Sequence, residues 1–424
     1  MTATWAAASL GGMLSLERAM AVVGLFAACG AVAASEGESW PQWGGPSRDF
    51  RVATESLTWP ERGLPIVWQL DLDEGYSGVV ASHGKLFTIG RRGDKERVVA
   101  LSADAGKTLW SYEYEAPLPS FLLTNHGVGP RSTPLLAGDR LFTVGITGTL
   151  LCLERDSGRL VWRRDLVTEL GGSRNTRGYA SSPLAFGELL ILPVGGAGQA
   201  LVAFRQASGE VAWKSGDLDA GMASPFLVEL GGEPQVVALL HGAVAGFVPA
   251  TGRLLWSHPH GGRGERNIST PVFGEDGRLF MSSAYGGGAR VVRLEAKSGK
   301  TEVSELWADE KVRVMFTNAL RIGRHIFVSS GDFGPVPLTA LAVETGAVAW
   351  RDRSFGRLNM VQLGRQVMVL DEKGSLGLVS LSDSGLTVHS RMQLPVDKAW
   401  TAPSVVGRRV YLRTNTALFA LELP

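Results

Sequence analysis

The sequence predicts an all-β fold: an eight-bladed β-propeller of four-stranded antiparallel blades whose last blade is closed by both termini. Three observations carry this prediction. A turn that ends in tryptophan recurs along the chain, a short run of small residues precedes each copy, and the two chain ends supply complementary parts of one unit. Repetition at a period of roughly 20 to 50 residues is typical of architectures built from stacked units.

The recurring turn has glycine four residues before tryptophan. Complete copies are Ala105-Gly106-Lys-Thr-Leu-Trp110 and the segments 157–162, 208–213, 251–256 and 345–350; a stretched copy spans 298–307. The segment 384–389 is degenerate, with histidine in the tryptophan position, and Trp68 lacks its turn. We expect the glycine to occupy the left-handed position of a hairpin between the third and fourth strands. The indoles then fill the outer gap between blades, at Trp68, Trp110, Trp162, Trp213, Trp256, Trp307 and Trp350.

A second landmark lies a few dozen residues before each tryptophan. It reads Ser132-Thr-Pro134 in one unit, with equivalents at 181–183, 223–225, 269–271 and 401–403, and weaker ones at 77–79, 317–319 and 358–360. Alternating runs such as 140–145 and 149–153 lie between the two landmarks. Each of the eight units is therefore predicted to hold four short strands.

The chain ends predict how the ring closes. The last unit, residues 400–423, supplies only three strands, whereas Pro65-Ile-Val-Trp68 is a fourth strand with no unit before it. We divide the chain into a signal peptide (1–34), a lead-in segment (35–63) and one propeller (64–424). Radial closure hides the sheet faces that a linear stack would leave exposed.

Composition narrows the functional classes. The chain has 424 residues, 45% of them hydrophobic, and its 42 Lys and Arg nearly balance 41 Asp and Glu. A net charge of +1 gives no sign of a protein that coats nucleic acid. The 54 glycines and 12 tryptophans suit many tight turns and aromatic anchors. Two cysteines, Cys29 and Cys152, cannot form a disulfide scaffold.

The N-terminus predicts export. Residues 19–35 form an uncharged apolar run, and Ala31-Val-Ala33 provides the small residues that signal peptidase requires. Cleavage after Ala33 or Ala34 would leave a periplasmic or secreted protein. The alternative is an outer-membrane lipoprotein, because the segment ending at Cys29 resembles a lipobox; only then would the protein attach to a membrane.

The pattern Ala-Leu followed by Ser/Thr-Gly and Trp, seen at 100–110 and in later variants, resembles the pyrroloquinoline-quinone-type propeller repeat. The opening Trp40-Pro-Gln-Trp-Gly-Gly-Pro-Ser-Arg-Asp49 resembles the start of exported bacterial proteins with this repeat. The resemblance implies one of two groups. Quinoprotein dehydrogenases bind the quinone and calcium at the propeller axis, whereas cofactor-free scaffolds include the propeller lipoprotein of the outer-membrane barrel-assembly machinery.

The residues favour the scaffold group. The dehydrogenases that the chain resembles are longer and carry a vicinal disulfide and a catalytic Asp beside calcium; here no cysteines are adjacent and no acidic ligand set can be assigned. We therefore expect no cofactor and no metal. His258 and His260 lack a third metal ligand, and we expect them to lie in a solvated loop. The segments 71–75 and 217–221 are similar to each other and to half of a calcium loop, but they lack the Glu that completes one.

Two functional classes remain. One is a non-enzymatic scaffold of envelope assembly, and the alternative is a quinoprotein-type dehydrogenase or another enzyme with its site in the axial funnel. We expect a monomer that binds a protein or an anionic glycan or peptide, and no nucleic acid. Cations lie just before the inner strands and would face the funnel: Arg131, Arg177, Arg266, Arg313, Arg357 and Lys398. No residue is proposed to be catalytic.

Overall fold

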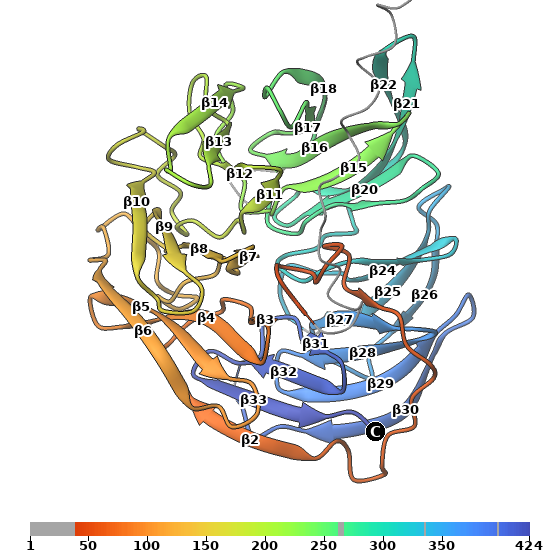
Figure 1. Cartoon of the computed structure of the whole chain (residues 1–424). Helices are drawn as coiled ribbons and strands as arrows, with labels where there is room; N and C mark the ends of the chain where they lie inside the picture. Colours follow the sequence, from red (N-terminus) through yellow and green to blue (C-terminus); the bar gives the residue numbers. More distant parts are fainter. Residues whose placement is uncertain (1–38, 262–266, 335, 397) are drawn as a thin grey trace, which may run out of the picture. The chain divides into compact units, whose positions relative to one another are not determined.

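The computed structural model describes residues 39–261, 267–334, 336–396 and 398–424. They form eight blades around one axis, each built on four antiparallel strands (Figure 1). Blade 1 contains β3 (Val80–Ser82), β4 (Lys85–Arg92), β5 (Lys95–Ser102) and β6 (Thr108–Glu115), and blade 2 contains β7 (Leu135–Ala137), β8 (Arg140–Val144), β9 (Thr149–Glu154) and β10 (Leu160–Asp165). Blade 3 contains β11 (Leu184–Phe186), β12 (Leu189–Pro193), β13 (Leu201–Arg205) and β14 (Val211–Ser215). Blade 4 contains β15 (Phe226–Leu230), β16 (Glu233–Leu240), β17 (Ala243–Phe247) and β18 (Leu254–Pro259). The predicted eight-bladed propeller is confirmed.

Blades 5 to 7 continue the same order from the innermost to the outermost strand. They contain β19 (Val272–Phe273), β20 (Arg278–Ser283), β21 (Gly288–Lys297) and β22 (Lys300–Asp309); β23 (Leu320–Ile322), β24 (His325–Ser329), β25 (Leu338–Ala342) and β26 (Val348–Asp352); and β27 (Leu358–Leu363), β28 (Gln366–Asp371), β29 (Ser375–Leu381) and β30 (Leu386–Gln393). The stretched tryptophan turn of the sequence corresponds to the long β21–β22 hairpin.

Blade 8 joins the two ends of the chain. It consists of β31 (Ser404–Val406), β32 (Arg409–Arg413), β33 (Ala417–Glu422) and the outermost strand β2 (Ile66–Asp71). Strand β2 pairs antiparallel with β33, with Trp68 opposite Ala420. The termini therefore complete one blade, as the sequence predicted. In the described part of the chain, no helix has the length and apolar character needed to span a membrane.

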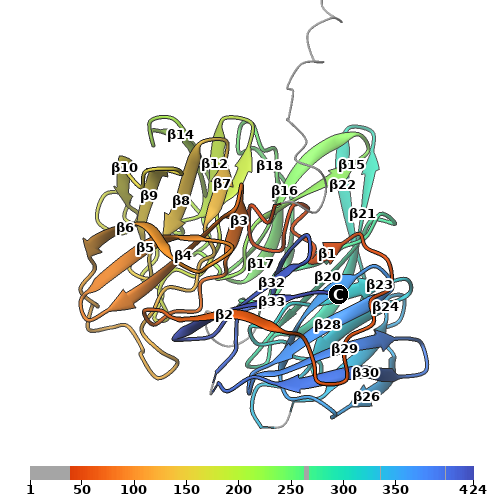
Figure 2. The same ribbon diagram turned by 60° about the horizontal axis from the view of Figure 1, so that its bottom comes forward.

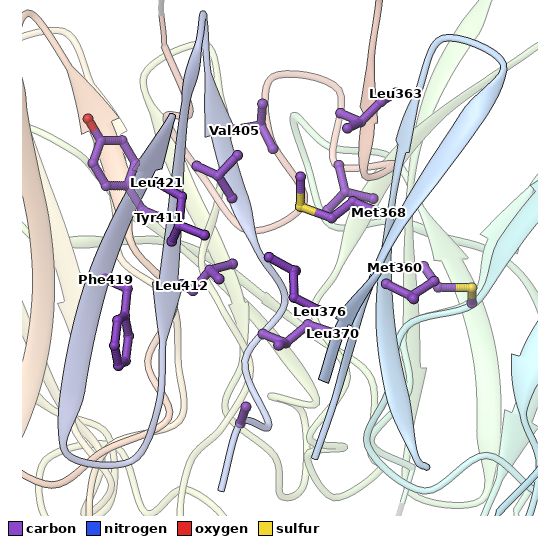
Figure 3. Close-up of a cluster of buried hydrophobic side chains, with 14 of the residues drawn as sticks. Met360, Leu363, Met368, Leu370, Leu376, Val405, Tyr411, Leu412, Phe419 and Leu421 are labelled. Carbon is purple, nitrogen blue, oxygen red and sulfur yellow. The ribbon is translucent and has the colours of Figure 1, made fainter. Parts of the chain in front are cut away.

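The apolar core lies between neighbouring blades. Figure 3 shows this packing at the seam between blades 7 and 8, where Met368 and Leu370 of β28 face Val405 and Leu412. All four of these side chains are buried. Because every second residue of a strand points to the same sheet face, each blade presents apolar side chains to both of its neighbours. The seam is thus packed like the other blade interfaces.

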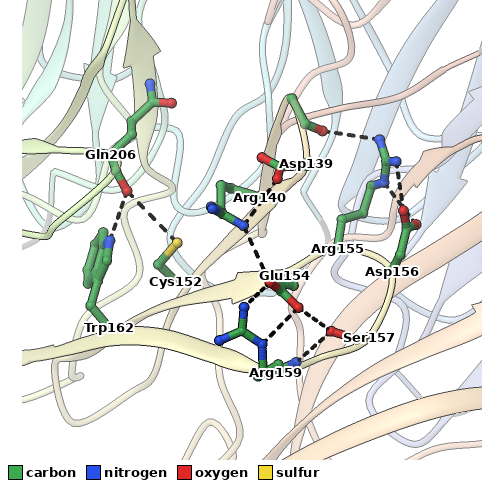
Figure 4. Close-up of polar contacts among 11 residues, drawn as sticks. Asp139, Arg140, Cys152, Glu154, Arg155, Asp156, Ser157, Arg159, Trp162 and Gln206 are labelled. Atoms are coloured by element: carbon green, nitrogen blue, oxygen red, sulfur yellow. Dashed lines mark hydrogen bonds and ion pairs between the residues drawn. The ribbon is translucent and has the colours of Figure 1, made fainter.

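The repeat tryptophans join blades at their outer edge. Trp162 Nε1 donates to the Gln206 carbonyl of the next blade at 2.8 Å (Figure 4), and Trp110 Nε1 donates to the Arg155 carbonyl at 3.0 Å. The turn glycine of the next blade packs on the indole: a Cβ on Gly158 would lie 2.5 Å from the Trp110 ring. The turn glycine therefore meets two requirements, a φ of +72° and the close approach of an aromatic ring.

Two blades depart from this pattern. Trp256 of blade 4 donates instead to Gln235 Oε1 of its own blade at 2.8 Å. The turn glycine of the elongated hairpin in blade 5, Gly299, does not pack on this indole, since a Cβ there would meet nothing within 4 Å. In blade 7 the expectation that His389 replaces tryptophan is off by one residue. In blade 1 the bulged residue comes directly before Trp110, which pairs with Ala100 of the third strand. In blade 7 the bulged residue is His389 itself, so Ser390 takes the paired position that tryptophan has in blade 1.

The lead-in segment crosses several blades before it enters β2. Strand β1 (Arg51–Val52) pairs in parallel with the inner edge of β27 and makes blade 7 five-stranded. Trp40 exchanges backbone hydrogen bonds with Ala81 in blade 1, and the Pro41 carbonyl accepts from Leu136 in blade 2. Figure 2 shows this segment beside the innermost strands. Sequence periodicity gave no sign of β1.

Candidate functional site

The small-residue landmarks form a hydrogen-bonded ring around the propeller axis. The Gly78 amide donates to Thr133 Oγ1 at 3.1 Å, and the Thr133 amide donates to Ser182 Oγ at 2.9 Å. The ring continues from the Ser182 amide to Ser224 Oγ at 2.9 Å and from the Ser224 amide to Thr270 Oγ1 at 3.1 Å. Each hydroxyl therefore satisfies a buried amide of the preceding blade, which explains why Ser or Thr recurs here.

Amide side chains extend the ring on the other side of the axis. Asn359 Oδ1 accepts from the Asn318 amide at 3.0 Å, while Asn359 Nδ2 donates to the Trp400 carbonyl at 3.0 Å. Thr401 Oγ1 then donates to the Tyr76 carbonyl at 2.9 Å and links blade 8 to the start of blade 1. These polar side chains therefore link neighbouring blades.

The ring surrounds an axial cavity of about 1250 Å³, including its open part. One end, which we call the mouth, carries Tyr76, His126, Phe316 and Trp400. The other end, the floor, is formed by lead-in residues Trp40, Trp43, Gly44 and Phe50. The mouth residues lie in the loops that lead into the innermost strands, at the end where those strands begin. The lead-in segment pairs with residues within the innermost strands, toward the end where those strands finish. The floor therefore lies at the opposite end of the axis.

The mouth is an aromatic cluster centred on Trp400. The Tyr76 ring stacks on Trp400 with centroids 5.0 Å apart, and the Phe316 ring lies 4.9 Å from Trp400. Lys398 Nζ lies 5.5 Å from the Trp400 ring, and the Arg357 guanidinium lies 5.0 Å from the Phe316 ring. Aromatic faces with adjacent cations can bind apolar groups that carry negative charge.

The floor depends on an unusual turn in the lead-in. Gly44 and Gly45 have φ values of +78° and +81°, and a Cβ on Gly45 would lie 2.9 Å from the Trp40 ring. Phe50 meets Trp43 edge to face, with centroids 4.6 Å apart. Arg48 and Phe50 also have positive φ values, 57° and 58°, which side chains other than glycine rarely adopt. The Gly-Gly pair thus lets the chain fold tightly over the axis.

Two of the predicted funnel cations line the cavity. Arg131 donates to the Arg177 carbonyl at 2.6 Å and to the Gly127 carbonyl at 3.0 Å, and burial lowers the pKa of its guanidinium to about 10. Arg177 donates to Asn125 Oδ1 from the neighbouring loop. Both cations are fixed in place by hydrogen bonds to the loops at the mouth.

The other predicted cations have different positions. Arg357 lines an adjoining groove that shares Phe316 and Trp400 with the cavity, and Arg357 Nη1 pairs with Glu372 at 3.4 Å. Arg313 is paired with Asp332 at 2.8 Å. Neither Arg313 nor Lys398 lines the cavity or the groove. Arg266 lies outside the described residues.

Sequence reasoning missed Arg48 below the floor. This side chain is only 8% exposed, and burial lowers its pKa to about 9, so it remains charged at neutral pH. Its guanidinium donates to the Pro183 carbonyl at 2.9 Å, to the Ser182 carbonyl at 3.3 Å and to Gln42 Oε1 at 3.0 Å. The available signal was the opening Trp-Pro-Gln-Trp-Gly-Gly-Pro-Ser-Arg segment, which lies outside the repeat.

The remaining sequence candidates have structural positions. His260 is buried rather than solvated: Ser283 Oγ lies 2.9 Å from its Nε2, and burial lowers its pKa to about 3. His258 faces Glu305 at 3.6 Å instead. Asp73 pairs with Arg97 at 2.6 Å. No group of three metal-ligating side chains of the His, Cys, Asp or Glu type occurs among the described residues.

The described lining does not fit a calcium-bound quinone. It contains no carboxylate, and the oxygens of Asn318 and Asn359 already accept backbone hydrogen bonds within the ring. Cys152 is the free cysteine of the described chain; it is buried in β9, where burial raises its pKa to about 12. The hard cation would lack the anionic oxygen ligands it requires.

Comparison with known proteins agrees with the repeat. The family described as outer membrane protein assembly factor BamB matches residues 94–352. The chain belongs to this family. The resemblance to pyrroloquinoline-quinone-type repeats is therefore confirmed, within the BamB family. No curated protein sequence matches the chain.

Solved structures share the fold at low sequence identity. BamB from Moraxella catarrhalis is 18% identical with a TM-score of 0.59, and the match covers 85% of this chain and 99% of that one. Quinohemoprotein alcohol dehydrogenase from Comamonas testosteroni is 12% identical with a TM-score of 0.64, covering 92% and 81%. The computationally designed protein Ika8 is 11% identical with a TM-score of 0.54, covering 83% and 98%. These structural similarities support the fold alone.

Proposed function

We propose that this member of the BamB family is a non-enzymatic scaffold of the bacterial cell envelope that captures a partner protein at its loop face. The loop face is the end of the propeller that carries the cavity mouth. The observation behind this proposal is the described lining of the axial cavity, which combines Arg131, Arg177 and aromatic rings with no carboxylate. Such a lining is suited to acidic or apolar groups of a partner.

Family membership supports a role in envelope assembly. The family is described as an outer membrane protein assembly factor, and we extend that role to this chain. Residues 1–34 would then act as the signal peptide and deliver a periplasmic monomer. If Cys29 is lipidated instead, the protein would be anchored to the outer membrane. Both alternatives concern residues outside the described part of the chain.

The loop face also carries exposed apolar side chains suited to a protein partner. Phe333 is 75% exposed, and its ring lies 5.6 Å from that of Tyr285 near the cavity. Phe121 and Leu123 are exposed in the loop between blades 1 and 2. Exposed aromatic side chains near cations are typical of the centre of a protein interface.

Site-specific crosslinking from within the cell envelope tests this proposal. A photoreactive amino acid replaces Phe333, and in the control it replaces Arg365, which is exposed in the β27–β28 turn at the opposite end of the propeller. We expect a discrete crosslinked protein from position 333 and none from position 365. Raised salt should reduce the yield, since the mouth is cationic. Crosslinking only from position 365 would refute the assignment to the loop face.

A further inference from the structure

The polar atoms of the cavity wall are already bonded within the protein. Thr133 Oγ1 and Ser182 Oγ accept from buried amides of neighbouring blades. Arg131 donates to two carbonyls of the mouth loops, and the Glu74 carboxylate acts on its charge. A charged group that entered the cavity would give up its water for polar atoms that are already engaged, which costs free energy. The interior therefore favours an uncharged ligand.

The rest of the wall is aromatic and apolar. Met222, Ile268 and Met315 line the cavity, and the Phe316 ring lies 4.9 Å from Trp400 at the mouth. Methionine is unbranched and has a polarisable sulfur, so it adapts to ligands of different shape and packs well on aromatic rings. Pockets with such linings bind apolar bodies. The space, about 1250 Å³ with its open part, has room for a large side chain.

The floor shows how aromatic side chains reach this axis. The lead-in lies outside the repeat and is held on the innermost strands by backbone hydrogen bonds, at Trp40 with Ala81 and at β1 with β27. It delivers Trp40, Trp43 and Phe50 to the far end of the cavity, where Trp40 is 2% exposed and Phe50 is 4% exposed. The closed floor also means that no polypeptide can thread through the axis. A ligand from a partner can enter only as a side chain inserted through the mouth.

A groove at the mouth gives such a segment a place to lie. It is formed by loops of blades 6 and 7 and shares Phe316 and Trp400 with the cavity. The groove also contains Phe355, Arg357 and Phe333. Phe333 is 75% exposed, so the groove reaches the apolar side chain that projects from the loop face. The cavity and the exposed part of the loop face are therefore continuous.

From these features we infer that the axial cavity holds one uncharged, bulky apolar side chain of a partner protein, inserted through the mouth by an extended segment that lies along the groove. The inserted side chain packs against Trp400, Phe316 and the methionines of the wall. Acidic residues beside it meet Lys398, which is exposed at the rim. This inference rests on the proposed function in that the ligand belongs to a protein, and it adds the class of side chain that is recognised.

Fluorine NMR with a capped amino acid tests the chemistry on the mature protein. The probe is N-acetyl-4-fluorophenylalanine amide, and the matched control is the same compound with a free carboxylate. Measurement in about 0.3 M salt screens the cations of the rim. We expect the amide to bind at least as tightly as the acid. It should also bind at least about tenfold more tightly than N-acetylalanine amide, measured by competition, since burial of an aromatic side chain contributes that much.

A peptide separates a protein side chain from a small apolar molecule. The heptapeptide acetyl-Ala-Ser-Ala-Phe-Ala-Ser-Ala amide carries 4-fluorophenylalanine at its centre and no charge. It should bind at least about threefold more tightly than the capped amino acid, because its flanking residues contact the groove. The same peptide with alanine at its centre should show no displacement of the probe.

Two cavity-filling variants connect the binding to the wall. Ala180 and Ala402 line the cavity on the segments that lead into blades 3 and 8, and both keep some exposed surface. Ala180→Leu and Ala402→Leu should each weaken heptapeptide binding at least about tenfold, because the added side chain occupies the space. Ala308→Leu, at an exposed position of β22, is the matched control and should leave the affinity unchanged. Thermal unfolding of all three variants checks folding, and either folded wall variant is sufficient.

Each result has a defined meaning. Tighter binding of the acid than of the amide assigns the cavity to an anion and overturns the inference, and equal binding of the alanine and phenylalanine amides overturns it too. Tighter binding of the capped amino acid than of the heptapeptide assigns the cavity to a small molecule, and unchanged affinity in a folded wall variant places the site elsewhere; both contradict the inference. If no probe binds but position 333 crosslinks to a partner, this inference fails and the proposed function stands. If the heptapeptide binds but no crosslink forms, the proposed function is the one that fails.

Discussion

The contact between turn glycine and indole makes a quantitative prediction about blade docking. Gly158 has a φ of +72°, and a Cβ there would lie 2.5 Å from the Trp110 ring. Gly138 lies in the same blade with a φ of +59°, but a Cβ there would meet nothing within 4 Å. The pair Gly158→Ala and Gly138→Ala therefore separates backbone strain from the cost of crowding the indole.

The magnitudes follow from these two geometries. A left-handed alanine costs about 1–2 kcal/mol, which is the full effect expected for Gly138→Ala. Forcing a methyl group into a packed contact costs about 1–3 kcal/mol more, so Gly158→Ala should lower the free energy of unfolding by about 2–5 kcal/mol. In the Trp110→Leu background, Gly158→Ala should cost no more than Gly138→Ala, since the leucine side chain leaves room for the methyl group.

Urea unfolding followed by far-ultraviolet circular dichroism measures these differences. The double-mutant cycle between positions 110 and 158 should give a coupling free energy of about 1–3 kcal/mol. Equal destabilisation by Gly158→Ala and Gly138→Ala would refute the reasoning. The turn glycine would then be required for its backbone conformation alone, and the indole would tolerate a methyl group.

Four further predictions address the ring, a buried histidine, the N-terminus and cofactors. Thr133→Val leaves an amide of blade 1 without an acceptor and should cost about 1–3 kcal/mol in urea unfolding, whereas Thr133→Ser should cost much less; equal costs would contradict the ring. Burial lowers the pKa of His260 to about 3, so below about pH 6.5 the unfolded chain binds a proton that the folded protein does not. This histidine should therefore lower the free energy of unfolding by about 1.4 kcal/mol for each pH unit below about 6.5, and His260→Gln should flatten this slope. Intact mass should show cleavage after residue 33 or 34; an intact Met1 would refute cleavage, and a diacylated Cys29 would indicate a lipoprotein. Titration with pyrroloquinoline quinone and calcium should give no stoichiometric uptake, and dye reduction with an alcohol would contradict this.

The fold was predictable because its signals are local and repeated. A glycine four residues before tryptophan defines a hairpin within one blade, and several copies fix the number of units. The second function of that glycine was not predictable, since Gly158 touches Trp110 of the preceding blade, 48 positions away in sequence. A contact between blades depends on how they stack. The pattern within one unit does not contain that information.

The candidate site was predictable only in part, because charges are partnered by loops distant in sequence. The position of Arg131 and Arg177 before inner strands suggested that they lie near the axis, and both line the cavity. Arg313 has the same kind of position but pairs with Asp332, from the loop between the second and third strands of its own blade. Sequence shows where a cation lies along a strand but not which carboxylate reaches it.

The tryptophans that fall outside the repeat were the overlooked signal for the cavity. Trp40, Trp43 and Trp400 have no place in the blade-docking pattern, and all three line the axial cavity. A large aromatic residue in a repeat protein is either part of the repeat or is needed for something the repeat does not supply. Here the repeat builds the wall from small hydroxyl residues, which leaves space at the axis. Trp40 and Trp43 close the floor, and Trp400 gives the mouth an apolar surface. The unit-by-unit pattern alone could therefore not reveal this cavity.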